Sequence, residues 1–466
     1  MRLDLPRSGL QDALVFSPED EPVLRDGPRL RVLLLTSGLG LGHVRAAQAI
    51  SAALKDQADV ATVDFWSLMH AGAARAIHAT YLDLVQNHSD LYERLYHLEA
   101  GTWRQVLESR SGPPRAVLEV FELIASVAVK EGLSIPRGGR YASDKLLYSL
   151  LCTSLPYDGD TLAGNGVRAR LALWKFTWLR LIRRLEPAIR KFAPDVIIST
   201  QMIPAAMASY LQQRGKVEAS MIGVLTDFGV HDFWRQKGID RYCVAHESIL
   251  DAEESTRTRA VVTGVPLMPA FAFPMSQAEA RRELKLPEHA PVVLVLGGGL
   301  GLSVDVAAAA LLQRQSATNV IVMPGKNDKA RAALDRLAAQ HPQRLTVSDW
   351  TDRMDIYLRA ADIVVGKPGG ITVAEALACG RPLLATRSLG GQEGFNVDFL
   401  TRNGVGGLVA DRDLANRVDG LLGDRGVLQN MQRRAWLLGQ RDGASRVAAL
   451  ALDFASVHRA VALQSR

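Results

Sequence analysis

The stretch ADIVVGKPGGITVAEALACGRPLLA, residues 361–385, contains a strand, a turn, a helix and the start of a second strand. The first strand ends at Val365, the turn KPGG has no bulky side chain where a ligand would approach, and Thr372 opens a helix with Glu375 in its first turn. Backbone N–H groups at a helix N-terminus bind phosphate, and a carboxylate one turn further can accept hydrogen bonds from a ribose diol. The same T-x-x-E spacing also fits a capping box that only stabilises the helix. The stretch predicts a parallel α/β sheet and leaves both roles open for its turn.

Strands and amphipathic helices alternate on either side of this stretch. The strands expected in the second half are PVVLVLGGG, NVIVMPG, RLTVSDW, ADIVVGK and RPLLATR, and those in the first half are RVLLLTS, DVATVDFW, PDVIIST, ASMIGVLTDF and RYCVAHES. Such alternation is typical of parallel sheets with helices on both faces. The chain is therefore predicted to hold two doubly wound, Rossmann-like α/β sheets in series. Ligands of such sheets bind beyond the carboxyl ends of the strands, so the cleft between the two sheets is the expected site.

The length of 466 residues is too great for one ordinary core and favours two domains. We expect an irregular lead-in over residues 1–28 and an N-terminal domain over 29–265, which carries a largely helical insertion at about 67–165. The Pro-punctuated passage TGVPLMPAFAFP connects it to a C-terminal domain over 266–440. Residues 441–466 are predicted to form a C-terminal helix, for which packing back on the N-terminal domain is one option.

The charge balance is mildly basic, with 55 Lys and Arg against 49 Asp and Glu and a net charge of +6. This excess suits an anionic membrane surface or a nucleotide-bearing substrate, and is too small and dispersed to indicate nucleic-acid binding. The three cysteines, Cys152, Cys243 and Cys379, form no CxxC pair, so we expect buried thiols in a reducing compartment. Neither a signal peptide nor a membrane-spanning segment is recognisable. We expect a cytoplasmic protein whose membrane contact is peripheral.

Two further glycine turns follow strands. LVLGGGLGLSVD, residues 294–305, is weak evidence alone, but together with KPGG it offers two phosphate-facing turns in one sheet, which suits a diphosphate. No Lys-Ser/Thr pair stands where a P-loop requires it. VLLLTSGLGLGHVRAA, residues 32–47, ends in His43, which fits a phosphate ligand, a catalytic base or a helix cap. Asp64 gives only weak support for a dinucleotide-binding reading of that turn.

The segment GVLTDFGVHDFW, residues 223–234, places Asp227 and His231 close together at the end of a strand. A carboxylate and an imidazole at the mouth of a cleft can deprotonate a hydroxyl group. The alternative is an aspartate that stabilises a turn and a histidine that packs in the fold.

In segment order the chain resembles glycosyltransferase family 28 from residue 30 to about 410, especially the branch of monogalactosyldiacylglycerol synthases and processive diacylglycerol glucosyltransferases. The motifs that carry the resemblance are TSGLGLGHVRAAQAI, VLTDFGVHDFW followed by DRYCVAHE, VTGVPLMPAF, VMPGKNDKARAAL, and DWTDRMDIYLRAADIVVGKPGGITVAEALACGRPLL with GGQEGFNVDFL. The resemblance implies a GT-B fold, a UDP-hexose donor bound mainly by the second domain, inversion at the anomeric carbon and no divalent metal. No cofactor is expected, since the UDP-sugar is a substrate, and the sequence has no clustered Asp-x-Asp for a metal.

The resemblance also implies roles for individual residues. Catalysis falls to His43, Asp227 and His231, of which any could be the base, with a slight preference for His43 at the reacting centre. The uracil is expected to lie against Trp350, Thr351 and Met354, and the ribose hydroxyls are expected to bind Glu375. The diphosphate is expected to meet the two glycine turns and the helix start, at Gly299, Leu300, Gly301, Gly369, Gly370 and Thr372. The hexose is expected to face Gln392 and Glu393, with Asn396 supporting them. The acceptor is expected to meet Gly42, Tyr81, Tyr92, Tyr96 and Trp234.

Two departures from the family pattern affect the acceptor and the sugar. Thr200-Gln201 stands where relatives often have Thr-His, which removes an imidazole near the acceptor, and Leu389–Gly391 replace a segment in which many relatives carry a proline. The segment HATYLDLVQNHSDLYERLYHLEAGTWR, residues 78–104, resembles the branch's Tyr-rich acceptor segment and suits a bilayer interface, with Arg137 and Arg140 able to meet lipid phosphates. The alternative is a helical cap that only packs on the sheet.

The favoured function is transfer of a hexose from a UDP-sugar to diacylglycerol or a related lipid hydroxyl at an anionic membrane surface. One alternative is a transferase of the same fold acting on another amphiphilic acceptor, such as a polyene or aryl lipid, a polyprenyl-linked saccharide or a natural product. Another is a nucleotide-sugar-binding regulator without turnover, against which the set His43, Asp227, Glu375 and Gln392 argues.

Overall fold

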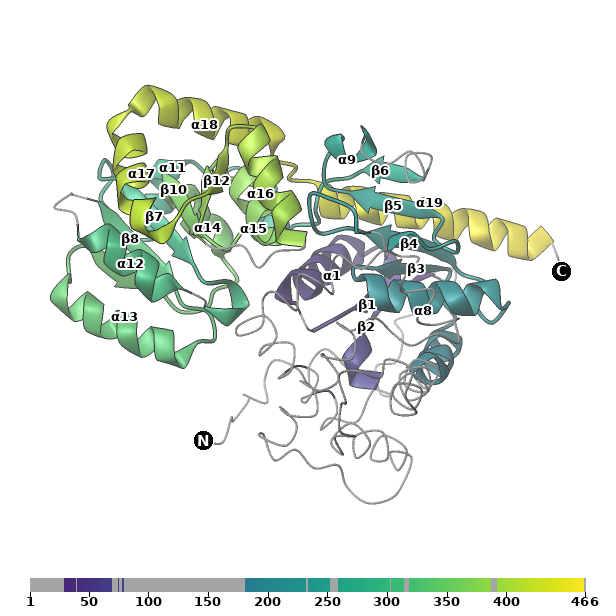
Figure 1. Cartoon of the computed structure of the whole chain (residues 1–466). Coiled ribbons are helices and arrows are strands. Elements are labelled where there is room, and N and C mark those ends of the chain that lie inside the picture. Colours follow the sequence, from purple (N-terminus) through teal and green to yellow (C-terminus); the bar gives the residue numbers. More distant parts are fainter. Residues whose placement is uncertain are drawn as a thin grey trace, which may run out of the picture.

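A computed structural model describes residues 29–38, 40–68, 74, 78, 181–231, 234–251, 259–301, 303–313, 318–386 and 392–464. They form two six-stranded sheets that follow one another along the chain, and Figure 1 shows each sheet inside its own lobe, with α1 of one lobe next to α15 of the other. The expected pair of parallel α/β sheets is confirmed.

The first sheet has the strand order β2-β1-β3-β4-β5-β6, and every neighbouring pair is parallel. Its central strands are continuous apolar runs, because helices cover both faces of the sheet. The elements of this lobe are β1 (Leu30–Thr36), α1 (Leu41–Leu54), β2 (Ala58–Asp64), η1 (Phe65–Leu68), helical residues 181–192, β3 (Val196–Ser199), α8 (Met202–Gln213), β4 (Ser220–Val224), β5 (Arg241–Val244), α9 (Ser248–Asp251) and β6 (Ala260–Val262).

The second sheet has the order β12-β11-β10-β7-β8-β9, again with parallel neighbours throughout. A short connection with η4 (Pro269–Phe271) leads into it. Its elements are α11 (Gln277–Glu283), β7 (Val292–Leu296), η5 (Gly298–Leu300), α12 (Val304–Leu312), β8 (Asn319–Met323), α13 (Asp328–Gln340), β9 (Leu345–Val347), α14 (Met354–Ala360), β10 (Ile363–Gly366), α15 (Gly370–Ala378), β11 (Leu383–Ala385), α16 (Gln392–Arg402), β12 (Gly406–Leu408), α17 (Asp411–Gly423) and α18 (Arg425–Leu438).

The chain returns to the first lobe in α19 (Gly443–Gln464), the yellow helix that lies along the first sheet in Figure 1. Val447, Ala448, Ala451 and Ala455 are buried with apolar residues of β1, β3, β4 and α1. The two connections between the lobes touch: a Cβ atom on Gly264 would lie 2.4 Å from Cβ of Gln440. Both ends of the described chain therefore contribute to the first lobe.

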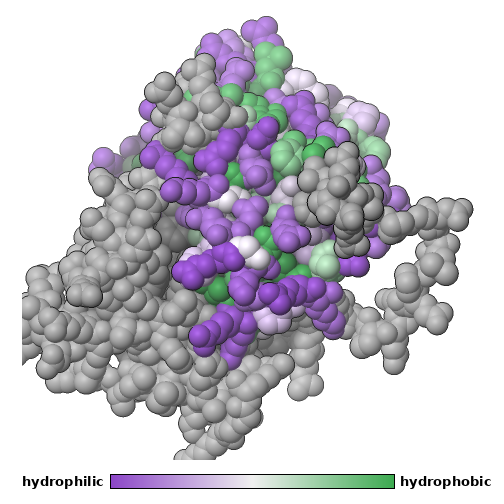
Figure 2. Space-filling view, turned by 90° about the vertical axis from the view of Figure 1, so that its right-hand side faces the viewer, coloured by the Kyte–Doolittle hydropathy of each residue, from purple (hydrophilic) through white to green (hydrophobic). Residues whose placement is uncertain are grey.

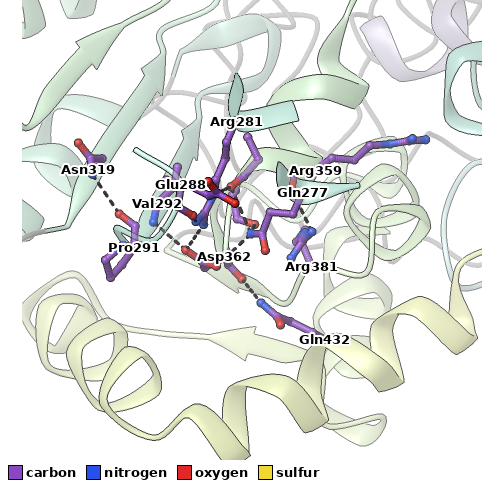
Figure 3. Close-up of polar contacts among 12 residues, drawn as sticks. Gln277, Arg281, Glu288, Pro291, Val292, Asn319, Arg359, Asp362, Arg381 and Gln432 are labelled. Carbon is purple, nitrogen blue, oxygen red and sulfur yellow. Dashed lines mark hydrogen bonds and ion pairs between the residues drawn. The ribbon is translucent and has the colours of Figure 1, made fainter. Parts of the chain in front are cut away.

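A cluster of polar contacts fixes the amino ends of the strands in the second sheet (Figure 3). Asp362, just before β10, accepts hydrogen bonds from Arg281 Nη2 (2.8 Å), the backbone N–H of Val292 (2.8 Å) and Gln277 Nε2 (3.0 Å). Its backbone carbonyl accepts a hydrogen bond from Gln432 Nε2 of α18 (3.2 Å). This cluster joins α11, β7 and α18 to the amino end of β10, at the opposite end of that strand from the KPGG turn.

Several element boundaries differ from those expected. α15 begins at Gly370, two residues before Thr372, and its N-cap residue is Gly369, so Thr372 and Glu375 do not form the capping box that was one of the two alternatives. Strands β6 and β12 were not expected at all. In the helical residues 181–192, Ile182, Leu185 and Ile189 are buried in the core of the first lobe.

The cysteines in the described part are Cys243 and Cys379, and both are free and buried. Burial raises the pKa of their thiols to about 12 and about 11, respectively, so both are protonated and unreactive at neutral pH.

Within the described ranges no helix is long and apolar enough to cross a bilayer. Figure 2 views the molecule from the right-hand side of Figure 1, and the described residues that it colours are mainly hydrophilic, with hydrophobic residues in small separate groups.

Candidate active site at the interface of the two domains

The loops that leave the carboxyl ends of the two sheets contact one another. A Cβ atom on Gly370, at the start of α15, would lie 1.9 Å from the backbone oxygen of Thr226, which follows β4. A Cβ on Gly42 in α1 would lie 3.2 Å from Ile371, and one on Gly299 would lie 2.3 Å from Leu41. Glycine is required at Gly370, because a Cβ atom there would collide with the backbone of the other domain, whereas at Gly299 the Leu41 side chain would have to shift. The predicted donor turns thus lie directly against the predicted catalytic loops.

His43 lies in the first turn of α1 and faces the loops that follow β3 and β4. Its Nδ1 is 3.4 Å from Thr226 Oγ1, and its backbone oxygen accepts a hydrogen bond from Thr200 Oγ1 at 3.0 Å. Burial lowers the pKa of His43 to about 4, and a hydrogen bond with the Thr200 backbone opposes that shift. The imidazole is therefore neutral at pH 7 and has a nitrogen available to accept a proton.

Asp227 follows β4 and is held by residues of the second domain. Asn396 Nδ2 donates a hydrogen bond to Asp227 Oδ1 at 2.9 Å, and Thr226 Oγ1 lies 3.5 Å from Asp227 Oδ2. Burial raises the pKa of Asp227, while Asn396, the Lys367 ammonium, the Gly370 backbone and Thr226 each oppose the rise. The Thr226 hydroxyl thus lies between His43 and Asp227, and the structure brings these two predicted catalytic residues together.

The N-terminus of α15 meets the loop that follows β4. Gly369 is its N-cap residue, the backbone of Gly370 forms a hydrogen bond with the Asp227 carboxylate, and Thr372 lies in its first turn without acting as a cap. The next backbone N–H groups have no acceptor within the helix, and the partial positive charge of a helix N-terminus attracts phosphate oxygens. The arrangement therefore favours phosphate binding over the capping alternative.

Glu375, one turn further along α15, is buried, and among the described residues its carboxylate accepts no hydrogen bond. Burial raises its pKa to about 7, Asp355 adds to the rise, and the Arg45 guanidinium opposes it. A buried carboxylate without donors is costly unless a ligand supplies them. This is the property expected of a group that binds a diol.

The glycine turn after β7 is tightly constrained. Gly301 has φ +58°, and a Cβ atom there would lie 1.9 Å from the backbone oxygen of Pro324. Asn327 Nδ2 donates to the Gly301 backbone oxygen at 3.0 Å. Gly299 and the backbone of Leu300 belong to η5, next to Leu41 of α1. The turn is therefore held rigidly between its own sheet and α1.

Trp350 is 49% exposed, and the guanidinium carbon of Arg45 lies 5.5 Å from the centre of its ring. Arg45 also pairs with Asp352 at 3.0 Å. The neighbouring hydroxyl of Thr351 accepts a hydrogen bond from the Arg353 backbone at 3.0 Å. An aromatic face and a hydroxyl are thus available beside α14, whereas Met354, the first residue of that helix, packs against the main core.

Gln392 and Glu393, which were expected to face the hexose, differ in their surroundings. Gln392 is the partly exposed first residue of α16. The carboxylate of Glu393 is buried and forms an ion pair with Lys367 of the KPGG turn. The expectation that Asn396 supports these two residues is corrected, because its side chain instead contacts Asp227 and the chain around it.

Of the residues predicted to bind the acceptor, Gly42 and Trp234 lie within the described part of the chain. Trp234 is buried in the core, where a Cβ on Gly223 would lie 3.2 Å from its ring, so its side chain does not line the interface. His231 is partly buried in the same loop, and its backbone oxygen accepts a hydrogen bond from the Trp234 backbone. Tyr81, Tyr92 and Tyr96, like Arg137 and Arg140, lie outside the described residues.

Three residues of the site, Thr226, Lys367 and Arg45, are not among the predicted ones. Lys367 and Thr226 stand in the KPGG turn and in GVLTDFGVHDFW, and their position directly after a strand is the signal that could have indicated them. Arg45 follows His43 by two residues, and nothing in the local pattern indicates that it reaches Trp350 in the other domain. Elsewhere in the described part, no group of three or more His, Cys, Asp or Glu side chains is placed to hold a metal ion.

Two segments of the chain match known families. The family described as Monogalactosyldiacylglycerol (MGDG) synthase matches residues 168–267, and the Glycosyltransferase family 28 C-terminal domain matches residues 292–445. Processive diacylglycerol beta-glucosyltransferases from Bacillus pumilus and Bacillus subtilis are 32% and 30% identical to the chain, over 54% of its length. The match covers 66% of each relative, so the chain spans just under two thirds of their length.

Solved structures resemble the whole fold at low identity. Acinetobacter baumannii MurG has a TM-score of 0.54 at 16% identity, covering 91% of this chain and 99% of that one. The glycotransferase of kitacinnamycin has a TM-score of 0.52 at 13% identity, covering 92% and 100%. Both likenesses concern the two-domain GT-B fold alone. In sequence, the chain is similar to the monogalactosyldiacylglycerol synthase and glycosyltransferase family 28 families over these two segments, and to processive diacylglycerol beta-glucosyltransferases over about half of its length.

Proposed function

We propose that this protein transfers a hexose from a UDP-sugar to the hydroxyl group of diacylglycerol or a related lipid, with inversion at the anomeric carbon. The observation that carries the proposal is the contact between two groups of residues from different domains. Asp227, with His43 on the other side of the Thr226 hydroxyl, lies against the N-terminus of α15, which also carries the buried Glu375. The names of the relatives supply the substrate class, a diacylglycerol acceptor.

The donor is proposed to bind along α15. The Glu375 carboxylate accepts hydrogen bonds from the ribose hydroxyls, and the uracil stacks on the exposed face of Trp350 beside Thr351. The diphosphate meets the backbone N–H groups that follow Gly370 in the first turn of α15, and the turn at Gly299. Helix N-termini and oriented amides stabilise the charge that develops on the departing UDP, so we expect no metal and no cofactor in the reaction.

The transfer is proposed to be one in-line displacement. The acceptor oxygen bonds to the anomeric carbon from the face opposite UDP, the bond to the diphosphate breaks, and UDP leaves with the bonding electrons. A base takes the acceptor proton during the attack. We assign this task to neutral His43, with Asp227 behind Thr226 to orient the pair and stabilise the imidazolium that forms.

The acceptor makes contact with a bilayer necessary. We propose peripheral attachment to an anionic surface on the cytoplasmic side, which the net charge of +6 supports. Gln201 bears on the choice of lipid, because its side-chain oxygen caps α8 by accepting from the Ile203 backbone at 2.7 Å. It therefore does not replace the acid-base capacity of the histidine found in relatives.

The test is to incubate the full chain with labelled UDP-glucose or UDP-galactose and diacylglycerol in anionic or neutral vesicles. Glycolipid is identified by mass and its anomeric configuration by NMR. His43→Ala is expected to lose about 10²- to 10⁴-fold in rate, while His289→Ala, an exposed histidine of the second domain, keeps the wild-type rate. If neither donor gives labelled lipid, the proposal is contradicted. If a panel of acceptors shows transfer to another amphiphile instead, the protein acts on the alternative class of acceptor.

A further inference from the structure

Asn396 of α16 is the residue of the second domain that holds the catalytic loop of the first. Its side chain is 0% exposed and makes three hydrogen bonds. Nδ2 donates to Asp227 Oδ1 and to the Pro368 backbone oxygen, both at 2.9 Å, and Oδ1 accepts from the Phe228 backbone at 2.8 Å. Two of these bonds cross from one domain to the other, and the third ties the same amide to the KPGG turn.

The orientation of this amide is determined by its surroundings. Nδ2 faces two acceptors, a carboxylate and a carbonyl, whereas Oδ1 faces an N–H group. Rotating the amide by 180° would place oxygen against oxygen twice and nitrogen against N–H once. The buried amide therefore has one allowed orientation, in which it forms hydrogen bonds with both the carboxylate of Asp227 and the backbone N–H of Phe228.

These contacts decide which oxygen of Asp227 is available for chemistry. Oδ1 is occupied by Asn396, and the Gly370 backbone also contacts the carboxylate. Oδ2 lies on the side of Thr226 Oγ1, at 3.5 Å, and that hydroxyl is 3.4 Å from His43 Nδ1. Fixing Oδ1 thus turns Oδ2 toward His43.

We propose that Asn396 is a positioning residue, which orients Asp227 toward His43 only when the donor domain lies against the acceptor domain. This inference rests on the proposed transferase function, and it gives Asn396 a role on the acceptor side of the reaction. A site assembled from both domains in this way is complete only in the closed arrangement, which protects the donor from water until the domains meet.

The first experiment follows hydrogen exchange of the backbone in residues 225–231, and it needs no substrate turnover. Asn396→Ala removes the acceptor of the Phe228 N–H, and we expect exchange in this peptide to rise roughly tenfold. Asn396→Asp keeps an oxygen for Phe228 but loses the donor for Asp227, so exchange is expected to change less. Asn403→Ala is the matched control, because its amide donates to the Phe399 backbone at the far end of the same helix.

The second experiment separates positioning from donor binding. Both Asn396 variants are expected to lower kcat by about 10²-fold while KM for the UDP-sugar and Kd for UDP stay within threefold of wild type. The charged groups around Asp227 are Lys367 after β10, its partner Glu393 on α16, and His43 on α1 when protonated. Because Asn396 lowers the pKa of Asp227, its loss is expected to move the acidic limb of the kcat profile to higher pH, and further for Asp than for Ala.

Wild-type exchange in residues 225–231 of Asn396→Ala, or weakened UDP binding with unchanged kcat, would overturn the inference. If Asn396→Ala does not fold, the comparison of Asn396→Asp with Asn403→Ala decides by the same measurements. If wild-type protein transfers no hexose to diacylglycerol, the proposed function fails, and the exchange experiment still decides whether Asn396 holds the loop.

Discussion

At the scale of single residues, Glu375 links donor binding to pH. Its pKa is raised to about 7 by burial, and hydrogen bonds from ribose hydroxyls stabilise the ionised form. UDP binding therefore favours loss of a proton: we expect the affinity to rise as the pH increases through about 7 and to level off above it. Calorimetry in two buffers with different ionisation enthalpies measures the proton released. Glu375→Gln is expected to bind UDP more weakly and without this pH dependence; a dependence that persists in the variant would assign it to another group.

Arg45, which belongs to the first domain, is expected to lower the pKa of Glu375 in the second domain. Its guanidinium lowers the pKa of Glu375, so Arg45→Ala should shift the midpoint of the UDP-binding profile to higher pH. Arg45→Lys is the matched variant, since it keeps the charge but loses the planar stacking on Trp350. If both variants bind UDP like the wild type at every pH, Arg45 does not act on the donor site.

The sequence could predict the positions of His43 and Asp227 at strand ends, because a buried strand followed by a glycine or polar turn is a local pattern. It could not predict the contact between Asn396 and Asp227, which are 169 residues apart. Nor could spacing distinguish Glu393, which forms an ion pair with Lys367, from Glu375, whose carboxylate accepts no hydrogen bond from the described residues. These differences depend on which side chains the closed domains bring together.

At the scale of elements, α15 begins with two adjacent glycines, of which Gly369 has room for a side chain and Gly370 has none. A Cβ on Gly369 would meet nothing within 4 Å, whereas one on Gly370 would collide with Thr226 and lie 2.7 Å from Asp227 Oδ1. Alanine in a helix is about 1 kcal/mol more favourable than glycine, so propensity alone predicts that Gly370→Ala stabilises the helix. We expect instead a loss of transfer of at least tenfold for Gly370→Ala and near wild-type activity for Gly369→Ala. Similar rates for the two variants would contradict the close contact.

Long apolar strands such as β1 and β7 could be recognised from their sequence, whereas β6 and β12 could not. β6 has three residues, and β12 contains Gly406 and Gly407, which have low strand propensity. Both are added at a sheet edge by pairing with a neighbouring strand. The start of α15 at Gly370 was also missed, because the backbone of Gly370 bonds Asp227 of the other domain, a contact that the local sequence does not show.

At the scale of the whole molecule, the stability of the first domain depends on α19. Val447 is fully buried with the residues of the first sheet, while Val457 on the same helix is 64% exposed. We expect Val447→Ala to lower the free energy of unfolding by about 2 kcal/mol and Val457→Ala to change it little. Denaturant unfolding followed by peptide-resolved hydrogen exchange measures both. Loss of protection in β1 and β3 is expected for Val447→Ala, and protection lost only in the second domain would contradict the packing.

Because α19 packs on the first domain, it also determines the order in which the two domains can complete folding during synthesis. The first sheet leaves the ribosome early, but the helix that buries one of its faces is translated only after the entire second domain. Until then the apolar face that includes Val32 and Ile198 is covered by α1 but lacks the part of its cover that α19 supplies. The N-terminal domain is therefore synthesised first, but it can complete its folding only after the second domain and α19 have been synthesised.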